Sequence, residues 1–406
     1  MTDFKQAGPI ATLPRLRCHD QHEREAELAV HARRTPLALV MPCLVSELDQ
    51  PALANMVSQL AGTPYLDTVV ISLDRADHAG FLRAIDYFRA LRLRTLVIWN
   101  DAEEVAAIIR EIESGILELG GRGKGRAVWV ALGAVIAEER AKAVAFLDAD
   151  VVTFERSLLT NLVYPVLHPA LDFDFAKGYY ARHSDRLHGR ATRLMVRPLL
   201  QALATAAGQH PYLEYLEAFR YPLAGEFAVS ASLLRRLRIP SDWGLEVGLL
   251  FEVLRHRSPR RICQVDLADR FDHKHQALSA NDPTGGLHRM SVDITKHLLR
   301  TLSAAGVVVP SSRFKGLQVA FQRFAEDAVA DSFAVAVFNG LSFDRHAEEE
   351  AVDVFTRAFA EGCEQFLQDP LGTPAMPNWA RVLSAMPEIG GRLLAAVHDM
   401  GGVIEP

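Results

Sequence analysis

Cysteine is scarce in this sequence, and long apolar runs are absent. Only four cysteines occur in 406 residues, at positions 18, 43, 263 and 363, and none forms a C-x-x-C pair. Such widely spaced thiols favour a reducing compartment over a disulfide framework or a zinc site. No apolar stretch approaches the roughly 18–20 residues of a membrane span, and the polar start Met1-Thr2-Asp3 is unlike a signal peptide. We therefore expect a cytoplasmic protein without a membrane span.

An excess of positive charge is also missing. The chain has 44 Lys and Arg against 50 Asp and Glu, so its formal net charge is −6. A protein without a basic field has no general electrostatic attraction for nucleic acid, and we expect no such partner. Apolar residues make up 49% and charged residues 23%, as in ordinary globular proteins. The length favours two structural units.

The first half of the sequence alternates between apolar runs and helical patterns. Strands are expected near residues 37–41, 68–73, 95–99 and 143–147, with helices of 10–15 residues between them. This alternation predicts right-handed βαβ units and a parallel sheet. Further strands are expected near 173–180 and 262–267, helices near 189–206 and from 242, and a mainly helical pattern from about 290 to the end.

One expected strand, Ala143–Leu147, ends at two carboxylates. Asp148 and Asp150 follow it with Ala149 between them. In α/β sheets, ligands bind beyond the carboxyl ends of the strands, where two acids are costly to desolvate unless a cation neutralises them. A divalent cation shared with a substrate phosphate is one candidate, and His273, after a late strand, is a possible further ligand. The alternatives are a helix N-cap with a solvated turn acid, and a surface histidine.

A glycine-rich stretch, Gly120–Gly125, precedes the helix expected at 126–139. It does not match a phosphate-binding P-loop, because Gly125 follows Lys124 where that motif needs serine or threonine. No strand directly precedes it, so the dinucleotide-binding fingerprint is excluded as well. Backbone amides, a helix N-terminus and Lys124 can still bind an anion together. A plain solvated loop is the alternative.

Polar candidates also occur in the second half. Gly189-Arg190-Ala191-Thr192 opens an expected helix, where amides, a guanidinium and a hydroxyl suit a phosphate or carboxylate. An ordinary first helical turn explains the stretch equally well. Glu226 and Glu246 each lie near glycine in turn-to-helix stretches. Either acid could cap a helix or accept a hydrogen bond from a substrate hydroxyl.

Six short segments occur in one order within residues 36–300. They are GKGRA, FLDAD, K-x-Y-Y-x-R, G-R-A-T-x-L-x-x-R-P-L-L, PLAGEFA and WGLEVGLL. This set resembles the glucosyl-3-phosphoglycerate synthase family and its mannosyl relatives, which are retaining GT-A-type glycosyltransferases. The resemblance implies an α/β fold with a GT-A-type (Rossmann-like), mostly parallel sheet flanked by helices. We expect an N-terminal helical segment (1–35), a GT-A domain (36–300, with nucleotide-binding and acceptor-binding halves meeting near 150) and a C-terminal helical extension (301–406).

The resemblance also implies roles for individual residues. The nucleotide sugar would contact Pro42, Leu44, Ser46, Glu47, Ser72, Lys124, Asp148, Ala149 and Asp150. The acceptor would contact Gly189, Arg190, Ala191, Thr192 and His275. Asp150 and His273 would hold the metal, and the catalytic residues would be Asp150, Glu246 and Leu223. Two departures from the family, Val45-Ser46-Glu47 and the run Phe271–His275, bear on the base and acceptor contacts.

The implied reaction is metal-dependent hexosyl transfer with retention. UDP-glucose is favoured as donor, GDP-mannose is the other option, and the acceptor would be a small phosphorylated acid such as 3-phosphoglycerate. The cation would be Mg²⁺ or Mn²⁺, and the protein a homodimer. No acid pair marks a double displacement, so we expect front-face attack, with Glu246 positioning the sugar.

Three alternatives compete with this function. A sugar-1-phosphate nucleotidyltransferase needs a glycine-rich loop directly after the first strand, and residues 41–44 offer none. A transferase of the same fold with another acceptor and a non-catalytic nucleotide-sugar-binding protein both stay open. Slow donor hydrolysis that depends on a divalent cation would distinguish an enzyme from a binding protein.

Overall fold

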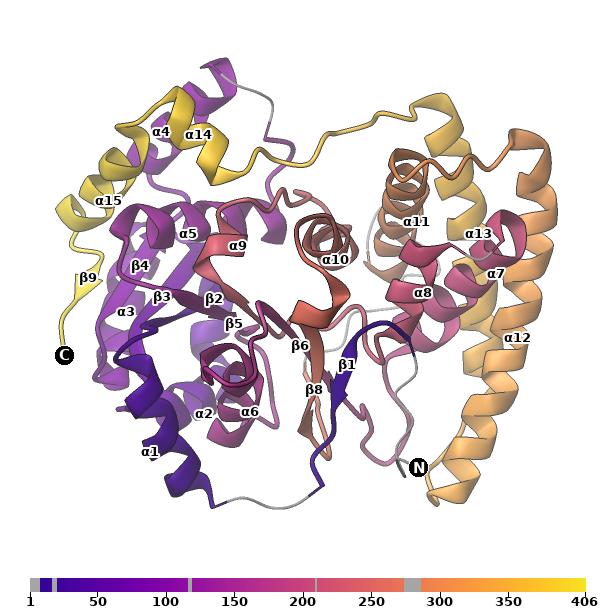
Figure 1. The fold of residues 1–406 in the computed structure, drawn as a ribbon, viewed down its shortest axis with the longest axis horizontal. Helices are drawn as coiled ribbons and strands as arrows, with labels where there is room; N and C mark the ends of the chain where they lie inside the picture. The colour runs from indigo at the N-terminus through magenta and orange to yellow at the C-terminus, as the bar shows by residue number, and fades with distance from the viewer. Residues whose placement is uncertain (1–7, 17–19, 116–118, 209, 274–285) are drawn as a thin grey trace.

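The computed structural model describes residues 8–16, 20–115, 119–208, 210–273 and 286–406. These residues form a nine-stranded sheet in the order β1-β8-β6-β7-β5-β2-β3-β4-β9, covered by helices (Figure 1). The strands are β1 (Ala11–Leu13), β2 (Leu37–Leu44), β3 (Leu66–Asp74), β4 (Thr95–Trp99), β5 (Ala143–Phe146), β6 (Phe175–Tyr180), β7 (Phe227–Ser230), β8 (Ile262–Ala268) and β9 (Val403–Ile404).

Four parallel strands, β5-β2-β3-β4, form the centre of the first half of the fold, as the apolar runs predict. Successive residues of β2 alternate between two cores: Ala38 and Val40 face one side, Leu39 and Met41 the other. Both faces are therefore buried. Helices α4 (Glu103–Gly115) and α5 (Lys124–Glu138) cover one face, and the other is covered by α1 (Gln21–Ala32), α2 (Pro51–Leu60), α3 (His78–Phe88) and α6 (Arg156–Leu167).

The second half of the sheet is mixed. Strand β7 runs antiparallel between β5 and β6, and the sequence did not predict it. Stacking of Phe146 on Phe227, with centroids 4.2 Å apart, helps to hold this short strand in place. β8 lies parallel to β6, as a continuation of the expected α/β pattern.

The N-terminal segment is not purely helical, which corrects the prediction. Its strand β1 pairs in parallel with β8 and extends one edge of the sheet. The C-terminal region also returns to the sheet, because β9 pairs antiparallel with β4 at the opposite edge. Trp379 of α14 (Trp379–Ala385) stacks on Trp129 at 4.5 Å and donates to its carbonyl oxygen at 2.8 Å. The last part of the chain is therefore built into the first half of the fold.

The other helices lie mostly around the second half (Figure 1). After Gly189, the turn η3 (Ala191–Val196) is π-helical and continues into α7 (Arg197–Ala207). The remaining α-helices are α8 (Pro211–Ala218), α9 (Ala231–Leu234), α10 (Leu245–His256), α11 (Gly286–Ala304), α12 (Phe314–Phe338), α13 (Arg345–Gln368) and α15 (Ile389–Asp399). The 3-10 turns are η1 (Val45–Asp49), η2 (Arg89–Leu91), η4 (Pro259–Arg261) and η5 (Ser311–Arg313). Within the described residues, no helix combines the length and hydropathy of a transmembrane span.

Candidate active site

A large open cavity of about 1530 Å³ lies beyond the carboxyl ends of the central strands. Its wall includes Pro42 of β2, the turn Asp148–Asp150 after β5, and Glu246 of α10. Arg289 and Arg300 of α11 also line it, so the C-terminal helices help to enclose the space. Drug-sized ligands occupy pockets of roughly 300–1,000 Å³, so this cavity has room for two substrates.

Asp150 and His273, predicted from distant parts of the sequence, both line this cavity. An isolated antiparallel bridge between Val151 and His273 brings the two segments together. A backbone hydrogen bond of 2.8 Å from Val152 N to Asp272 O extends this contact. The pairing explains how a histidine after β8 comes to lie beside the turn after β5.

The electrostatics of Asp150 suit a bound cation. Burial and the neighbouring Asp148 carboxylate raise the pKa of Asp150 to about 6. Its charged form is therefore destabilised, and an added positive charge would offset that cost. A carboxylate oxygen and an imidazole nitrogen are both accepted by hard to borderline divalent cations such as Mn²⁺. The donor set fits the predicted metal.

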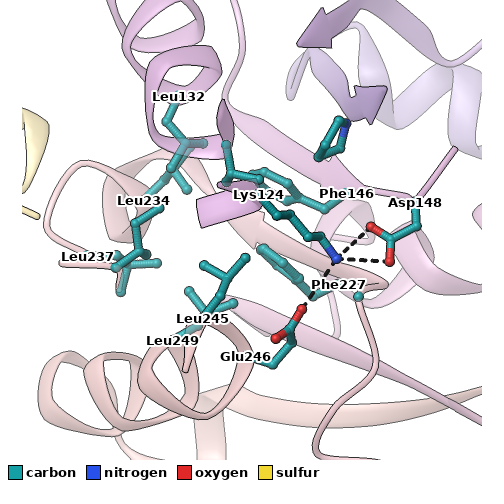
Figure 2. A pocket seen from close by; sticks show the side chains of 14 residues that line it. Lys124, Leu132, Phe146, Asp148, Phe227, Leu234, Leu237, Leu245, Glu246 and Leu249 are labelled. Carbon is teal, nitrogen blue, oxygen red and sulfur yellow. Dashed lines mark hydrogen bonds and ion pairs between the residues drawn. The ribbon is translucent and has the colours of Figure 1, made fainter. Parts of the chain in front are cut away.

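Lys124 lies between two carboxylates in this structure (Figure 2). Its Nζ is 2.7 Å from Oδ1 of Asp148 and 3.3 Å from Oε1 of Glu246. Burial lowers the pKa of Lys124, but the two carboxylates outweigh it and raise the pKa overall, so the side chain stays an ammonium. A Cβ added to Gly225 would lie 2.4 Å from Oδ2 of Asp148, so only glycine leaves room for that carboxylate. The predicted contact between Lys124 and a diphosphate requires these pairs to rearrange.

An apolar hollow borders the Lys124 network (Figure 2). Leucines of three helices and two stacked phenylalanines line it: Leu132, Leu234, Leu245, Leu249, Phe146 and Phe227. Apolar walls on this side lower the local polarity around the charged groups and strengthen their interactions.

Further buried ionisable groups lie at and behind the cavity wall, which Glu226 and Tyr180 line. The side chain of Lys177 is fully buried, and its Nζ donates to the carbonyl oxygen of Ala224 at 2.5 Å. Burial lowers the pKa of Lys177 to about 8. Glu226 accepts a hydrogen bond of 2.8 Å from the Tyr180 hydroxyl, and burial with the charge of Asp148 raises its pKa to about 7. Sequence reasoning named Glu226 as a helix cap or as an acceptor for a substrate hydroxyl, but it gave no role to Lys177 or Tyr180, although K-x-Y-Y contains both.

The predicted acceptor stretch lies at the cavity, except for one residue. Gly189 has φ of +73°, and its carbonyl accepts from the amides of Thr192 and Arg193, each at 3.0 Å. Gly189, Arg190 and Ala191 line the cavity. Thr192 does not: it is 3% exposed, and its Oγ1 has no hydrogen-bond partner in the described part of the chain. A direct acceptor contact by this hydroxyl is therefore not supported, because the helical turn directs it inward.

The other predicted residues divide in the same way. Those lining the cavity are Pro42, Leu44, Glu47, Ser72, Lys124, Asp148, Ala149, Asp150, Leu223, Glu246 and His273. Ser46 is exposed and lies outside the lining, which corrects its assignment. The hydroxyl of Ser72 donates to Ala127 O at 2.8 Å and accepts from Asn100 Nδ2 at 2.9 Å. His275 lies outside the described residues.

Among the cavity-lining arginines that sequence reasoning did not assign, Arg122 and Arg182 make the clearest contacts. Arg122 of the glycine-rich stretch donates to Asp74 Oδ1 at 2.5 Å and also contacts Asp101, which ties the stretch to the end of β3. Arg182, the last residue of K-x-Y-Y-x-R, lines the cavity and donates to the Tyr221 hydroxyl at 3.2 Å. Its position two residues beyond a strand was the signal that could have identified it.

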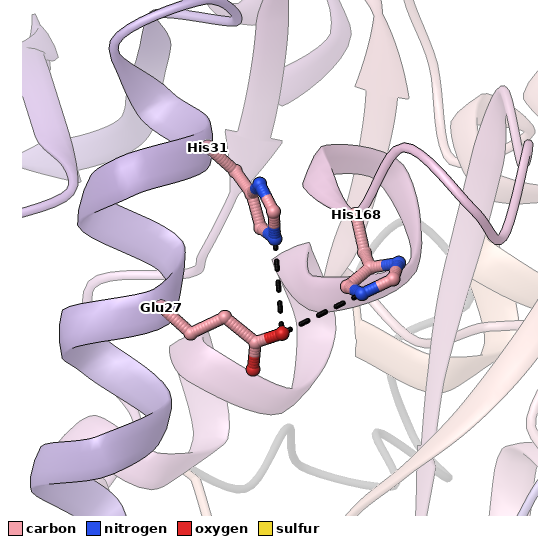
Figure 3. Close-up of side chains that lie close together, drawn as sticks. All are labelled: Glu27, His31 and His168. Carbon is pink, nitrogen blue, oxygen red and sulfur yellow. Dashed lines mark ion pairs between the residues drawn. The ribbon is translucent and has the colours of Figure 1, made fainter.

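A further group of possible metal ligands occurs outside the cavity lining (Figure 3). Oε1 of Glu27 lies 3.7 Å from His31 Nε2 and 3.5 Å from His168 Nε2. Nδ1 of His168 accepts from the amide of Ala170 at 3.3 Å, so the proton of the neutral ring is on Nε2, facing the carboxylate. This group links α1 to the residue that follows α6.

The mostly parallel sheet, the D-A-D turn after β5 and the cavity above it define a glycosyltransferase of the GT-A class. No protein-family model matches the chain. The glucosyl-3-phosphoglycerate synthase of Persephonella marina is 40% identical over 399 residues, 98% of this chain and 99% of the relative. The enzyme of the same name from Methanococcoides burtonii is 38% identical over 366 residues, 89% of each chain. The chain belongs to the glucosyl-3-phosphoglycerate synthase family.

Solved structures confirm the fold. Glucosyl-3-phosphoglycerate synthase from Mycobacterium tuberculosis, in complex with Mn²⁺, UDP and glucosyl-3-phosphoglycerate, has a TM-score of 0.52 at 24% identity, over 74% of this chain and 89% of that one. Mannosyl-3-phosphoglycerate synthase from Rubrobacter xylanophilus has a TM-score of 0.54 at 23% identity, over 70% and 80%. The chain therefore has the GT-A-type fold expected from the sequence. The relatives of 40% and 38% identity show that it is an enzyme.

Proposed function

We propose that this enzyme transfers glucose from UDP-glucose to 3-phosphoglycerate with retention of configuration. The observation that carries the proposal is the 40% identity to a glucosyl-3-phosphoglycerate synthase over nearly the whole length of both chains. The cavity supports it, because its lining includes Lys124 and Asp150 and also Arg190, which stands at the start of the helical turn η3. A donor and an anionic acceptor can therefore bind together.

Asp150 and His273 would hold the divalent cation, Mg²⁺ or Mn²⁺. When bound, a divalent cation offsets the charge that develops on the diphosphate as the glycosidic bond breaks. Mycobacterium tuberculosis glucosyl-3-phosphoglycerate synthase has been solved with each of these metals. The raised pKa of Asp150 fits a carboxylate that is stabilised by a cation.

We favour front-face attack over a covalent glycosyl–enzyme intermediate. Glu246 accepts a hydrogen bond from Lys124, and Glu226 accepts one from the Tyr180 hydroxyl. Both carboxylates are therefore already engaged by side chains of the protein. In front-face attack, the acceptor oxygen bonds to the anomeric carbon on the face that the diphosphate leaves, and the diphosphate takes the hydroxyl proton. Leu223 lines the cavity and has polar groups only in its backbone, whose carbonyl could accept a hydrogen bond from that hydroxyl and orient it. Glu246 would position the sugar.

The test is a transfer assay with purified enzyme, UDP-glucose and Mn²⁺. We expect a glucosylated product with 3-phosphoglycerate and little or none with unphosphorylated glycerate. NMR of the anomeric proton would show whether the α configuration is kept. GDP-mannose as the better donor would overturn the choice of sugar nucleotide, and transfer to none of the phosphorylated acids would overturn the acceptor.

A homodimer and a cytoplasmic location are the remaining parts of this proposal. The end of α12 carries exposed apolar side chains, including Val337 at 61% and Phe338 at 90% exposure. Exposed apolar groups gathered at one place are typical of an interface. We expect light scattering after size exclusion to give twice the mass of one chain. The substitution Phe338→Asp should lower the measured mass toward that of a monomer. An unchanged dimer would locate the interface elsewhere.

A further inference from the structure

A buried glutamate of the C-terminal region binds the acceptor stretch. Glu348 of α13 is 5% exposed. Each of its two carboxylate oxygens pairs with an arginine at the start of the helical turn η3. Oε1 accepts from Nε of Arg190 at 2.8 Å, and Oε2 accepts from Nη1 of Arg193 at 2.9 Å. More than 150 residues separate Glu348 from both arginines, so this contact depends on the tertiary fold.

The surrounding structure holds this carboxylate firmly. Glu348 lies in the first turn of α13, where the helix dipole favours a negative charge, and Asp344 caps that helix by accepting from Ala347 N at 3.1 Å. Arg193 also donates to Ser332 Oγ of α12 at 2.6 Å and to His188 O at 2.9 Å. Helices α12 and α13 therefore both bind the π-helical turn that follows Arg190. Such turns are rare and occur often at functional sites.

Arg190 keeps part of its guanidinium for a ligand. Its Nε bonds to Glu348, whereas Nη1 and Nη2 have no hydrogen-bond partner among the described residues, and the residue lines the cavity. Arg190, Arg193 and Glu348 together carry one net positive charge. The two terminal nitrogens form the end-on pair of donors, which can bind two oxygens of a phosphate or carboxylate together.

We propose that Glu348 is a positioning residue of the acceptor subsite, which fixes Arg190 so that its terminal nitrogens are ready for an anionic acceptor. This inference rests on the proposed function, because it takes Arg190 to bind the acceptor. Without the carboxylate, Arg190 and Arg193 would be neighbouring like charges with no counterion, and Arg190 would move away from its bound position. The entropy cost of ordering the Arg190 side chain again would then weaken acceptor binding. The C-terminal helices thus take part in acceptor recognition.

The experiment compares wild type with Glu348→Gln, which removes the charge but keeps the size. We expect the KM for 3-phosphoglycerate to rise about tenfold or more, the scale of one lost charge-assisted hydrogen bond. The KM for UDP-glucose and the kcat at saturating acceptor should change by less than about twofold. Glu348→Asp, which keeps the charge, should recover part of the loss. Glu349→Gln is the matched control, because its exposed side chain pairs only with Arg345.

Calorimetry with 3-phosphoglycerate, in the presence of UDP and Mn²⁺, makes the test independent of turnover. An unchanged acceptor affinity in Glu348→Gln with a lowered melting temperature would reduce Glu348 to a structural role. Tighter binding would show that Glu348 competes with the acceptor for Arg190, and a parallel rise in the KM for UDP-glucose would place its effect on the whole fold. Each of these results overturns the inference. Wild-type protein that binds 3-phosphoglycerate without transferring glucose to it would instead sink the proposed function alone.

Discussion

Replacing Asp150 by alanine is expected to abolish glucosyl transfer, with a loss of at least about a thousandfold in kcat/KM. Asp150 belongs to the turn after β5, and like His273 it lines the cavity. Without it, the cation that neutralises the leaving diphosphate would lose its charged ligand. The measurement is the rate of transfer across a Mn²⁺ titration, together with the effect of a chelator on wild type.

The fold should survive this substitution. Burial and Asp148 raise the pKa of Asp150 to about 6, so its folded-state charge costs stability at neutral pH, and removing it should leave the melting temperature unchanged or higher. Asp86→Ala, at an exposed position of α3, is the control for loss of an aspartate. Transfer that persists in Asp150→Ala, or wild-type activity that ignores the chelator, would contradict a role in metal binding.

The parallel part of the sheet could be predicted because its signal is local. Strands such as β2 and β3 are continuous apolar runs, and each is followed by a helix with apolar positions at helical spacing. The strands β1, β7 and β9 have only two to four residues and are defined by partners far away in sequence. No local pattern distinguishes such strands from turns, so they were missed.

The same distinction applies to the candidate site. Four predicted residues stand next to a feature that the sequence shows, namely a strand end, a glycine-rich stretch or a helix start. All four line the cavity: Asp148, Asp150, Lys124 and Arg190. Ser46, by contrast, follows a cavity-lining strand but is directed to solvent.

Contacts across the fold had no comparable signal. The Val151–His273 bridge and the pairing of Glu348 with Arg190 join segments more than 100 residues apart. Only tertiary packing creates them. Sequence reasoning therefore identified several chemical groups of the site without showing how they are held.

Arg190→Ala is expected to raise the KM for 3-phosphoglycerate by about a hundredfold, because a charge-assisted pair in a partly buried site contributes about 2–3 kcal/mol. Arg190→Lys should recover little, since an ammonium cannot reproduce the paired terminal nitrogens of a guanidinium. Slow hydrolysis of UDP-glucose to water should continue in both variants, because the donor side of the cavity is built from Asp150, Lys124 and their neighbours.

Measuring transfer and hydrolysis side by side separates the two roles that Arg190 could have. Arg323→Ala, on the exposed face of α12, controls for the loss of one positive charge. Equal loss of transfer and hydrolysis would place Arg190 in the donor site or in the fold, whereas unchanged transfer would remove it from the site. Loss of transfer with intact hydrolysis would show that the helical turn after Gly189 selects the acceptor, through the arginine that Glu348 holds there.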